Sequence, residues 1–209
     1  MISELRVGPL AVADGATITQ RASKDTTTVV QDGHAAYQEA VYRGSVFIAS
    51  NQAGVAITAG LPVISLGFSI YNPIASGKNL VIWSAETGFT INETGTALAG
   101  VIALAAGVGP NVAAPTGTTA LTKYNALLNP TVNSVASVYS TATFVGAPVY
   151  LKTLASLQAP AAATTVDVFA PITSDIRGSI IIPPGVWVAF AATAALTLQS
   201  SMTWEEIPI

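Results

Sequence analysis

The only histidine of the chain, His34, is the residue best suited to acid–base or metal chemistry. Asp32 lies two residues before it and Glu39 five residues after it. A metal site or a general base would need further ligands or a nucleophile brought in by the fold, because one histidine between two carboxylates has no specific spacing. We therefore expect His34 to form a hydrogen bond at a loop or a subunit contact.

Paired carboxylates and glycine-containing motifs are the other sequence features that could indicate a catalytic or nucleotide-binding site. Glu205 and Glu206 are adjacent carboxylates, but neighbouring residues of a strand point to opposite faces, so the pair could not flank one glycosidic bond. We expect them to be solvated charges where the chain leaves the sheet. The sequence has no Gly-x-Ser-x-Gly elbow, and Gly107-Val108-Gly109 lacks the following Lys-Ser or helix start of a phosphate loop. The sequence predicts no catalytic residue, no cofactor and no metal ligand, and we expect a protein that is not an enzyme.

The three tryptophans, Trp83, Trp187 and Trp204, allow two interpretations. They could line a sugar-binding groove of a receptor-binding protein. Packing in a core or a subunit interface is the commoner role, since large aromatic side chains dominate the energetics of both. The candidates for interface residues are Trp204, Trp187, Tyr37 and Arg43.

Charge is scarce in this chain of 209 residues. Charged residues make up 9% of the sequence, against roughly 25% in an ordinary soluble domain. Either uncharged polar residues cover the surface, or part of it is buried against other subunits, where charge is depleted. The second interpretation predicts an oligomer. The net charge of −3 and the scattered lysines and arginines argue against a nucleic-acid partner, because tracking phosphates needs clustered positive charge.

The chain has no cysteine, which excludes disulfides and thiolate metal sites, so stability must come from packing. Residues 1–20 include Glu4 and lack a continuous apolar core, so we expect no signal peptide. The longest apolar run, residues 97–108, is broken by Gly100 and Gly107 and falls short of the roughly 20 residues that span a bilayer. We expect a soluble protein with no membrane partner.

The last thirty residues show the clearest strand pattern. A β-branched run ends at Pro183-Pro184-Gly185, which predicts a turn. Alternating residues then predict strands over 186–191 and 196–203, with Trp204 at the end of the second. We expect these two strands to be antiparallel neighbours.

Turn signals and apolar runs predict further strands along the chain. Residues 32–43 allow either a short helix or a loop leading into a strand, and Gly44 ends the element in both cases. A strand is favoured over a helix at 95–107, and 111–133 is expected to be a long loop with a helical turn near 124–128. The remaining expected strands lie at residues 45–50, 54–58, 62–71, 80–83, 134–144, 149–154, 166–169 and 179–182.

Many short strands separated by such turns predict an all-β fold, an antiparallel β-sandwich of jelly-roll type with about eight strands. Residues 33–209 are expected to form this domain. Residues 1–32 have too few large apolar side chains for a core and are expected to be an extended arm, which either lies on a neighbouring subunit or is a poorly ordered terminus.

Several motifs from residue 32 onward resemble structural proteins of tailed bacteriophages and prophages. They are Tyr37-Gln38-Glu39-Ala40-Val41, Arg43-Gly44-Ser45-Val46-Phe47, Tyr71-Asn72-Pro73-Ile74-Ala75-Ser76-Gly77-Lys78-Asn79-Leu80-Val81, Ile181-Ile182-Pro183-Pro184-Gly185 and Met202-Thr203-Trp204-Glu205-Glu206-Ile207-Pro208. Residues 97–133 show no such resemblance. The resemblance implies a virion component with a jelly-roll body, assembled in the host cytoplasm.

On this resemblance we expect a capsid decoration or vertex protein that binds the assembled shell, with the major capsid protein as a partner. The alternative is a tail or fibre-tip module that binds host-surface glycans. The low charge also predicts that the chain associates with itself, and a homotrimer is favoured over a dimer or a pentamer.

Overall fold

The computed structural model describes residues 38–60, 64–91, 98–107, 114–128, 131–145, 148–159 and 172–209. The chain divides between Glu39 and Ala40 into two units, and the sandwich belongs to the second. The predicted arm at 1–32, the predicted strand at 166–169, His34 and Tyr37 lie outside the described residues.

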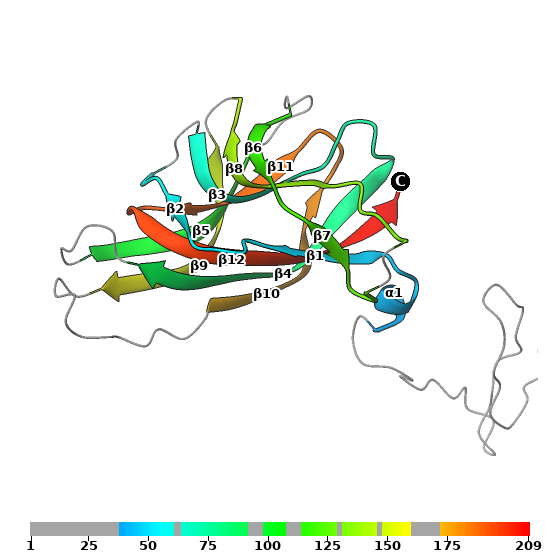
Figure 1. The fold of residues 1–209 in the computed structure, drawn as a ribbon, viewed down its shortest axis with the longest axis horizontal. Coiled ribbons are helices and arrows are strands. Elements are labelled where there is room, and N and C mark those ends of the chain that lie inside the picture. The colour runs from blue at the N-terminus through cyan, green and yellow to red at the C-terminus, as the bar shows by residue number, and fades with distance from the viewer. Residues whose placement is uncertain are drawn as a thin grey trace, which may run out of the picture. The chain divides into compact units, whose positions relative to one another are not determined.

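The described part of the chain consists almost entirely of strands (Figure 1). No helix in these ranges is long and apolar enough to cross a membrane. The elements in chain order are α1 (Gln38–Tyr42), β1 (Val46–Ser50), β2 (Val55–Ile57), β3 (Ile64–Tyr71), β4 (Lys78–Ile91), β5 (Leu98–Gly107), β6 (Thr116–Ala120), β7 (Lys123–Asn125), β8 (Ser137–Thr143), β9 (Val149–Ala159), β10 (Ile172–Ile182), β11 (Trp187–Ala192) and β12 (Leu196–Pro208).

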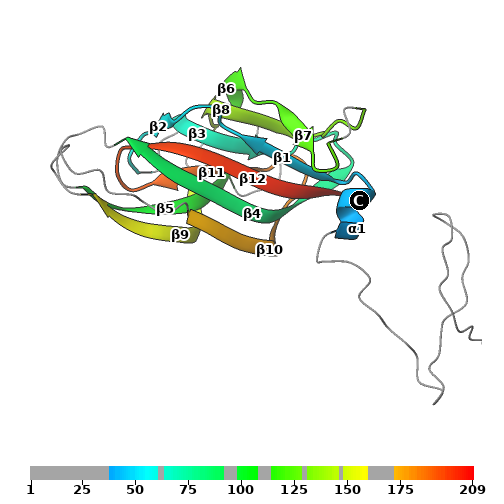
Figure 2. The same ribbon diagram turned by 60° about the horizontal axis from the view of Figure 1, so that its bottom comes forward.

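The strands form two antiparallel sheets packed face to face (Figures 1 and 2). The first sheet has the order β10-β4-β12-β1-β7, with β2 also paired to β12, and the second has the order β6-β8-β3-β11-β5-β9. Four of the pairs are nested in the sequence: β1 with β12, β3 with β11, β4 with β10 and β5 with β9. Successive pairs alternate between the sheets, as in one long hairpin that has been rolled up. This is the jelly-roll arrangement, so the predicted fold class is confirmed.

The core lies between the sheets and follows the period of two that a strand imposes. β12 buries every second side chain from Leu196 to Glu206. Within the core, Trp204 stacks on Phe47 with ring centroids 6.2 Å apart. A second apolar cluster surrounds Trp187, which stacks on Phe144 at 3.7 Å. β11 contributes to both clusters, and therefore all six of its residues are buried.

One predicted pairing of strands is wrong. β11 and β12 were predicted to be neighbours, but they lie in opposite sheets, and the connection between them crosses the sandwich. Residues 72–77 also cross between the sheets, from β3 to β4. Alternation identifies a strand and its buried face, but the partner depends on contacts distant in the sequence.

The boundaries of several elements also differ from the prediction. β12 does not end at Trp204 but continues to Pro208, while β4 and β9 are longer than expected. The predicted loop at 111–133 contains the strands β6 and β7, and a turn replaces the expected helical turn. The strand predicted at 95–107 is confirmed as β5.

Of the two alternatives for residues 32–43, the short helix α1 is found over its described residues. Gly44 ends it with a φ of 70°, a conformation that glycine adopts without a steric penalty.

Candidate functional site

An apolar groove opens between β9 and β10, the outermost strands of the two sheets, and we call it the edge groove. Figure 2 shows these two strands next to one another along the lower margin of the sandwich. The groove has a volume of about 820 Å³. Its lining consists of Leu151 and Lys152 from β9, Ser179, Ile180, Ile181 and Ile182 from β10, Pro183, Pro184 and Val186 from the following turn, and Ala106 and Val188 from β5 and β11.

β10 carries a large bulge beside the groove. Asp175 pairs with Ser84 and Ile180 pairs with Ile82, so four residues of β10 lie opposite one residue of β4. Within the bulge, Arg177 and Gly178 have φ values of 49° and 74°, which turn the chain out of the ladder. The part of β10 that lines the groove therefore begins within this bulge, at Ser179.

β9 loses its register on the other side of the groove. Its pairing with β5 shifts between Ile102 and Ala103 and again between Leu104 and Ala105. The two residues of β9 that are skipped are Leu154 and Leu151, and Leu151 lines the groove. Bulges bend a strand and release residues from the ladder, so both borders of the groove are shaped by irregular pairing.

The groove leads from solvent into the core. At its floor, Ala106, Ile182 and Val188 are fully buried members of the main core cluster. At its rim, Leu151 is 43% exposed and Ile181 is 55% exposed. A ligand in the groove would therefore contact the packed interior at one end and exposed aliphatic side chains at the other.

Lys152 is the only charged residue of this lining. The described part of the chain contains five cationic side chains. Lys78 pairs with Glu206, Lys123 donates to the Ala136 carbonyl and Arg177 pairs with Asp175, and Arg43 also has an interaction within the protein. Lys152 is half-buried, and its side chain makes no hydrogen bond or ion pair with the described residues. The edge groove thus combines an apolar interior with one unpartnered cation.

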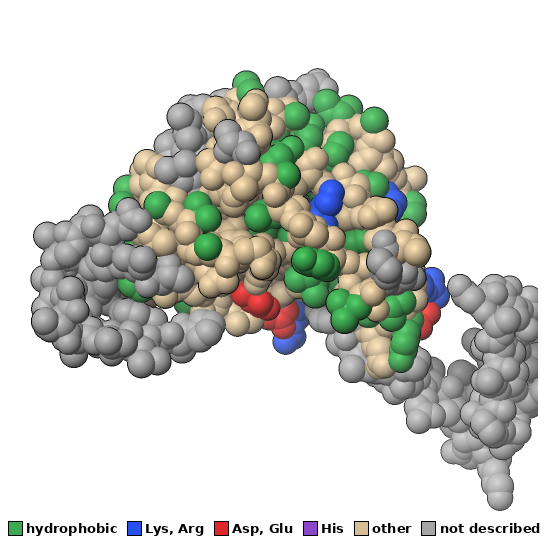
Figure 3. Space-filling view, viewed as in Figure 1, with side chains coloured by type: hydrophobic (Ala, Val, Ile, Leu, Met, Phe, Trp, Pro, Cys, Tyr) green, Lys and Arg blue, Asp and Glu red, His purple; other side chains and the backbone are tan. Residues whose placement is uncertain are grey.

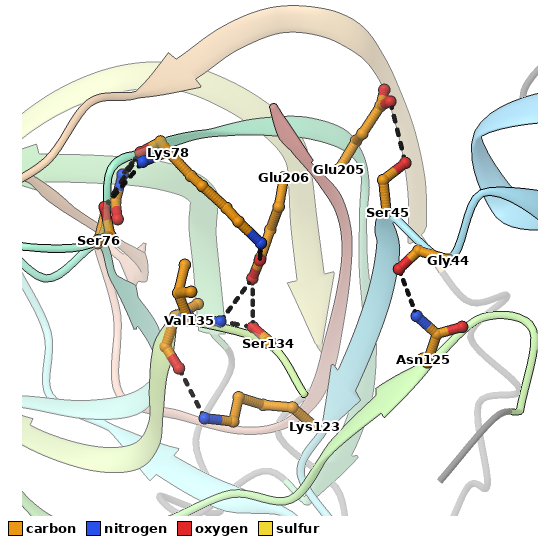
Figure 4. A network of polar contacts seen from close by, with 12 residues as sticks. Gly44, Ser45, Ser76, Lys78, Lys123, Asn125, Ser134, Val135, Glu205 and Glu206 are labelled. Atoms are coloured by element: carbon orange, nitrogen blue, oxygen red, sulfur yellow. Dashed lines mark hydrogen bonds and ion pairs between the residues drawn. The ribbon is translucent and has the colours of Figure 1, made fainter. Parts of the chain in front are cut away.

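A buried carboxylate organises a second site, at the far end of β12. Glu206 is 3% exposed, and its carboxylate accepts hydrogen bonds from Lys78 Nζ at 2.9 Å, Ser134 Oγ at 2.6 Å and the Val135 backbone N–H at 2.9 Å (Figure 4). We call these four residues the Glu206 clamp. A buried charge needs such partners because desolvation is costly. The clamp attaches the segment before β8 to the first sheet.

The clamp overturns the expectation that Glu205 and Glu206 are both solvated. Glu206 faces inward because the alternation of β12 continues through Trp204 to the next inward position. Glu205 is half-buried and accepts a hydrogen bond from Ser45 Oγ at 3.2 Å. Adjacent residues do point to opposite faces, as predicted, so the two carboxylates do not share a site.

The four interface candidates are not brought together. Trp204 and Trp187 are both fully buried, in different core clusters, and contribute no surface of the single chain. Arg43 is exposed beside Gly44, and Tyr37 lies outside the described residues. Trp83 is also buried, so no tryptophan forms an exposed sugar-binding groove.

Sequence reasoning identified neither the edge groove nor the Glu206 clamp. In the ranges that the structure describes, no group of three or more His, Cys, Asp or Glu side chains could hold a metal ion. No protein-family model, no curated protein and no solved structure matches the chain. Function is therefore inferred from the jelly-roll topology, the surface and these two features.

Proposed function

We propose that the protein is a non-enzymatic structural component of a tailed-phage virion, and that it binds the assembled shell as a capsid decoration or vertex protein. The observation that carries the proposal is a jelly-roll sandwich that exposes many large apolar side chains and few charges. Such a surface suits repeated contact with other subunits, because the cores of interfaces are depleted in charged residues and enriched in aromatic ones.

The composition of the exposed surface supports this proposal. On the face shown in Figure 3, apolar side chains are spread over the surface among uncharged side chains and backbone, and charged groups form only a few spots. The large apolar residues that the described chain exposes are Tyr42, Ile48, Ile74, Tyr124, Leu127, Leu128, Val132, Val145, Val149, Tyr150, Leu151, Ile181, Ile207 and Ile209. Exposed apolar residues are normal when single, but larger contiguous patches mark interaction sites.

Two of the motifs that resemble phage proteins meet in space. Asn72, which is fully buried, exchanges backbone hydrogen bonds with the turn before β11: its N–H donates to Val186 O at 2.9 Å, and its carbonyl accepts from Gly185 N at 2.7 Å. Its side-chain amide also donates to Ile182 O at 2.8 Å. The resemblance therefore involves residues that hold two crossings of the roll together, which supports a shared architecture more than a shared chemistry.

The location is tested by labelling the protein in purified virions and imaging them. Signal distributed over the shell is the expected result. Signal only at the tail would replace the proposal with the alternative, a tail or fibre-tip module that binds host glycans. For that alternative the binding surface would have to use exposed tyrosines such as Tyr42, Tyr124 or Tyr150, because the tryptophans are buried.

We also propose that the chain forms a homotrimer, so that identical neighbours cover part of the apolar surface. Light scattering on the purified protein should give a mass near three times 21.2 kDa. A stable monomer at micromolar concentration would contradict both the trimer and the explanation of the low charge.

A further inference from the structure

We infer that the edge groove is a binding site for an amphiphile with an aliphatic chain and an anionic head, of which a medium-chain or long-chain fatty acid is the simplest example. The inference concerns a small ligand in one subunit, and it does not depend on a place in a virion.

The first support is the size and lining of the groove. Its volume of about 820 Å³ lies within the range of roughly 300 to 1,000 Å³ that is typical of small-molecule sites. Ala106, Ile182 and Val188 form an apolar floor between the sheets, and Ile181 and Leu151 extend the apolar surface to the rim. An aliphatic chain that enters the floor leaves water for a packed apolar environment, which is the main favourable term in such binding.

The second support is the charge of Lys152. The other four cations of the described chain all interact with a protein group, whereas Lys152 lies half-buried in the lining without a partner there. A half-buried lysine can pack its aliphatic stem along apolar surface while its ammonium stays accessible to an anion. A carboxylate head group would supply that anion while its chain fills the groove, so the two features together define an amphiphile.

The third support comes from the strand edges, which favour a small ligand over an added strand of another protein. An extended peptide adds to a sheet through a regular row of free backbone groups. β10 has its four-residue bulge with positive φ at Arg177 and Gly178, and β9 has register shifts at Leu151 and Leu154. Bulges of this kind protect an edge against pairing. The irregular edges leave space for a chain but no regular ladder for a strand.

The test is a calorimetric titration of the full chain with dodecanoate, kept below its critical micelle concentration. We expect saturable binding of one molecule per subunit. Dodecyltrimethylammonium, which has the same chain and the opposite charge, should bind several-fold more weakly. In a series of shorter and longer carboxylates, each added methylene should tighten binding about three- to four-fold until the groove is full.

Substitutions inside and outside the groove lining test whether the ligand binds there. Lys152→Met should weaken dodecanoate binding about three- to five-fold and remove the preference over dodecyltrimethylammonium, because only a partly exposed charge contact is lost. Arg177→Gln is the matched control, since it removes a cation from β10 outside the groove lining, and it should leave binding unchanged. Ile181→Asp should weaken binding at least ten-fold. Because Ile181 is exposed, this variant should fold, as circular dichroism and light scattering can verify.

Three results would overturn the inference. They are the absence of saturable binding, equal effects of Lys152→Met and Arg177→Gln, and binding that survives Ile181→Asp. If dodecanoate fails to bind while Ile181→Asp lowers the oligomeric mass, the groove is a subunit contact. That result would refute the amphiphile site and leave the proposed virion role intact.

Discussion

Lys78 and Lys152 both lie at margins of the sandwich, but their surroundings are opposite. Lys78 pairs with Glu206, whose carboxylate is fully hydrogen-bonded within the clamp and closes one end of the first sheet. Lys152 has no partner in the described chain and borders an apolar space that the strands leave open. A buried charge needs protein groups that satisfy it, whereas a partly exposed cation beside a groove remains accessible to water or to a ligand.

The largest effect is expected at Trp204, which lies two residues before Glu206 on β12 and stacks on Phe47 in the core. Replacing this fully buried side chain in Trp204→Ala should lower the free energy of unfolding by about 3 to 5 kcal/mol, because it removes contacts and leaves a cavity. Denaturant titration measures the change. A loss under about 1 kcal/mol would contradict the buried position.

The next largest effect is expected in the Glu206 clamp. Glu206→Ala should lower the free energy of unfolding by about 2 to 3 kcal/mol, since it leaves Ser134 and the Val135 N–H without an acceptor. Lys78 is one-third exposed and can turn to water, which limits the loss.

Glu205→Ala is the control for the clamp, because it removes the adjacent carboxylate and only one side-chain hydrogen bond. It should cost less than about 1 kcal/mol. Equal losses for the two variants would show that Glu206 is no more structural than its half-buried neighbour. Hydrogen exchange near residues 134–136 should increase in Glu206→Ala alone.

Replacing each lysine by methionine compares Lys78 and Lys152 directly. Lys78→Met should destabilise the protein by about 1 to 2 kcal/mol, because the buried carboxylate loses its cation. Lys152→Met should change the free energy of unfolding by less than about 0.5 kcal/mol, since no protein group depends on it. Thermal denaturation without added ligand compares the pair. A larger effect at Lys152 would mean that its charge serves the fold.

Local patterns in the sequence predict much of this fold. The alternation in residues 196–203, the β-branched run before Pro183 and the helix-ending Gly44 were correct indications because each depends on neighbours a few residues away. The jelly-roll class followed from many short strands with frequent turns.

The strand partners, the Glu206 clamp and the edge groove could not be predicted from such local patterns. β11 and β12 adjoin in sequence, yet they pair in different sheets, because the closing of the roll selects distant partners. Glu206 was expected in solvent because charge at the end of an apolar pattern normally marks an edge, although continuing the alternation past Trp204 places it inward. The edge groove joins residues of β9, β10 and β11 through bulges. Gly178, an isolated glycine in a strand pattern, is a local signal for the bulge of β10, whereas no glycine or proline marks the register shifts at Leu151 and Leu154.

The nested pairing of the jelly roll has a consequence for how the chain acquires its structure. Val46 of β1 pairs with Glu205 of β12, so the first strand of the sandwich has no partner in β12 until that strand has emerged from the ribosome. Pairs so distant in sequence carry a large loop-closure cost, and folds dominated by them form in milliseconds to seconds instead of microseconds. Until β1 has paired with β12, its apolar face, including Phe47, can contact non-native apolar surfaces. Synthesis of the protein is therefore expected to depend on chaperones more than its size alone would suggest.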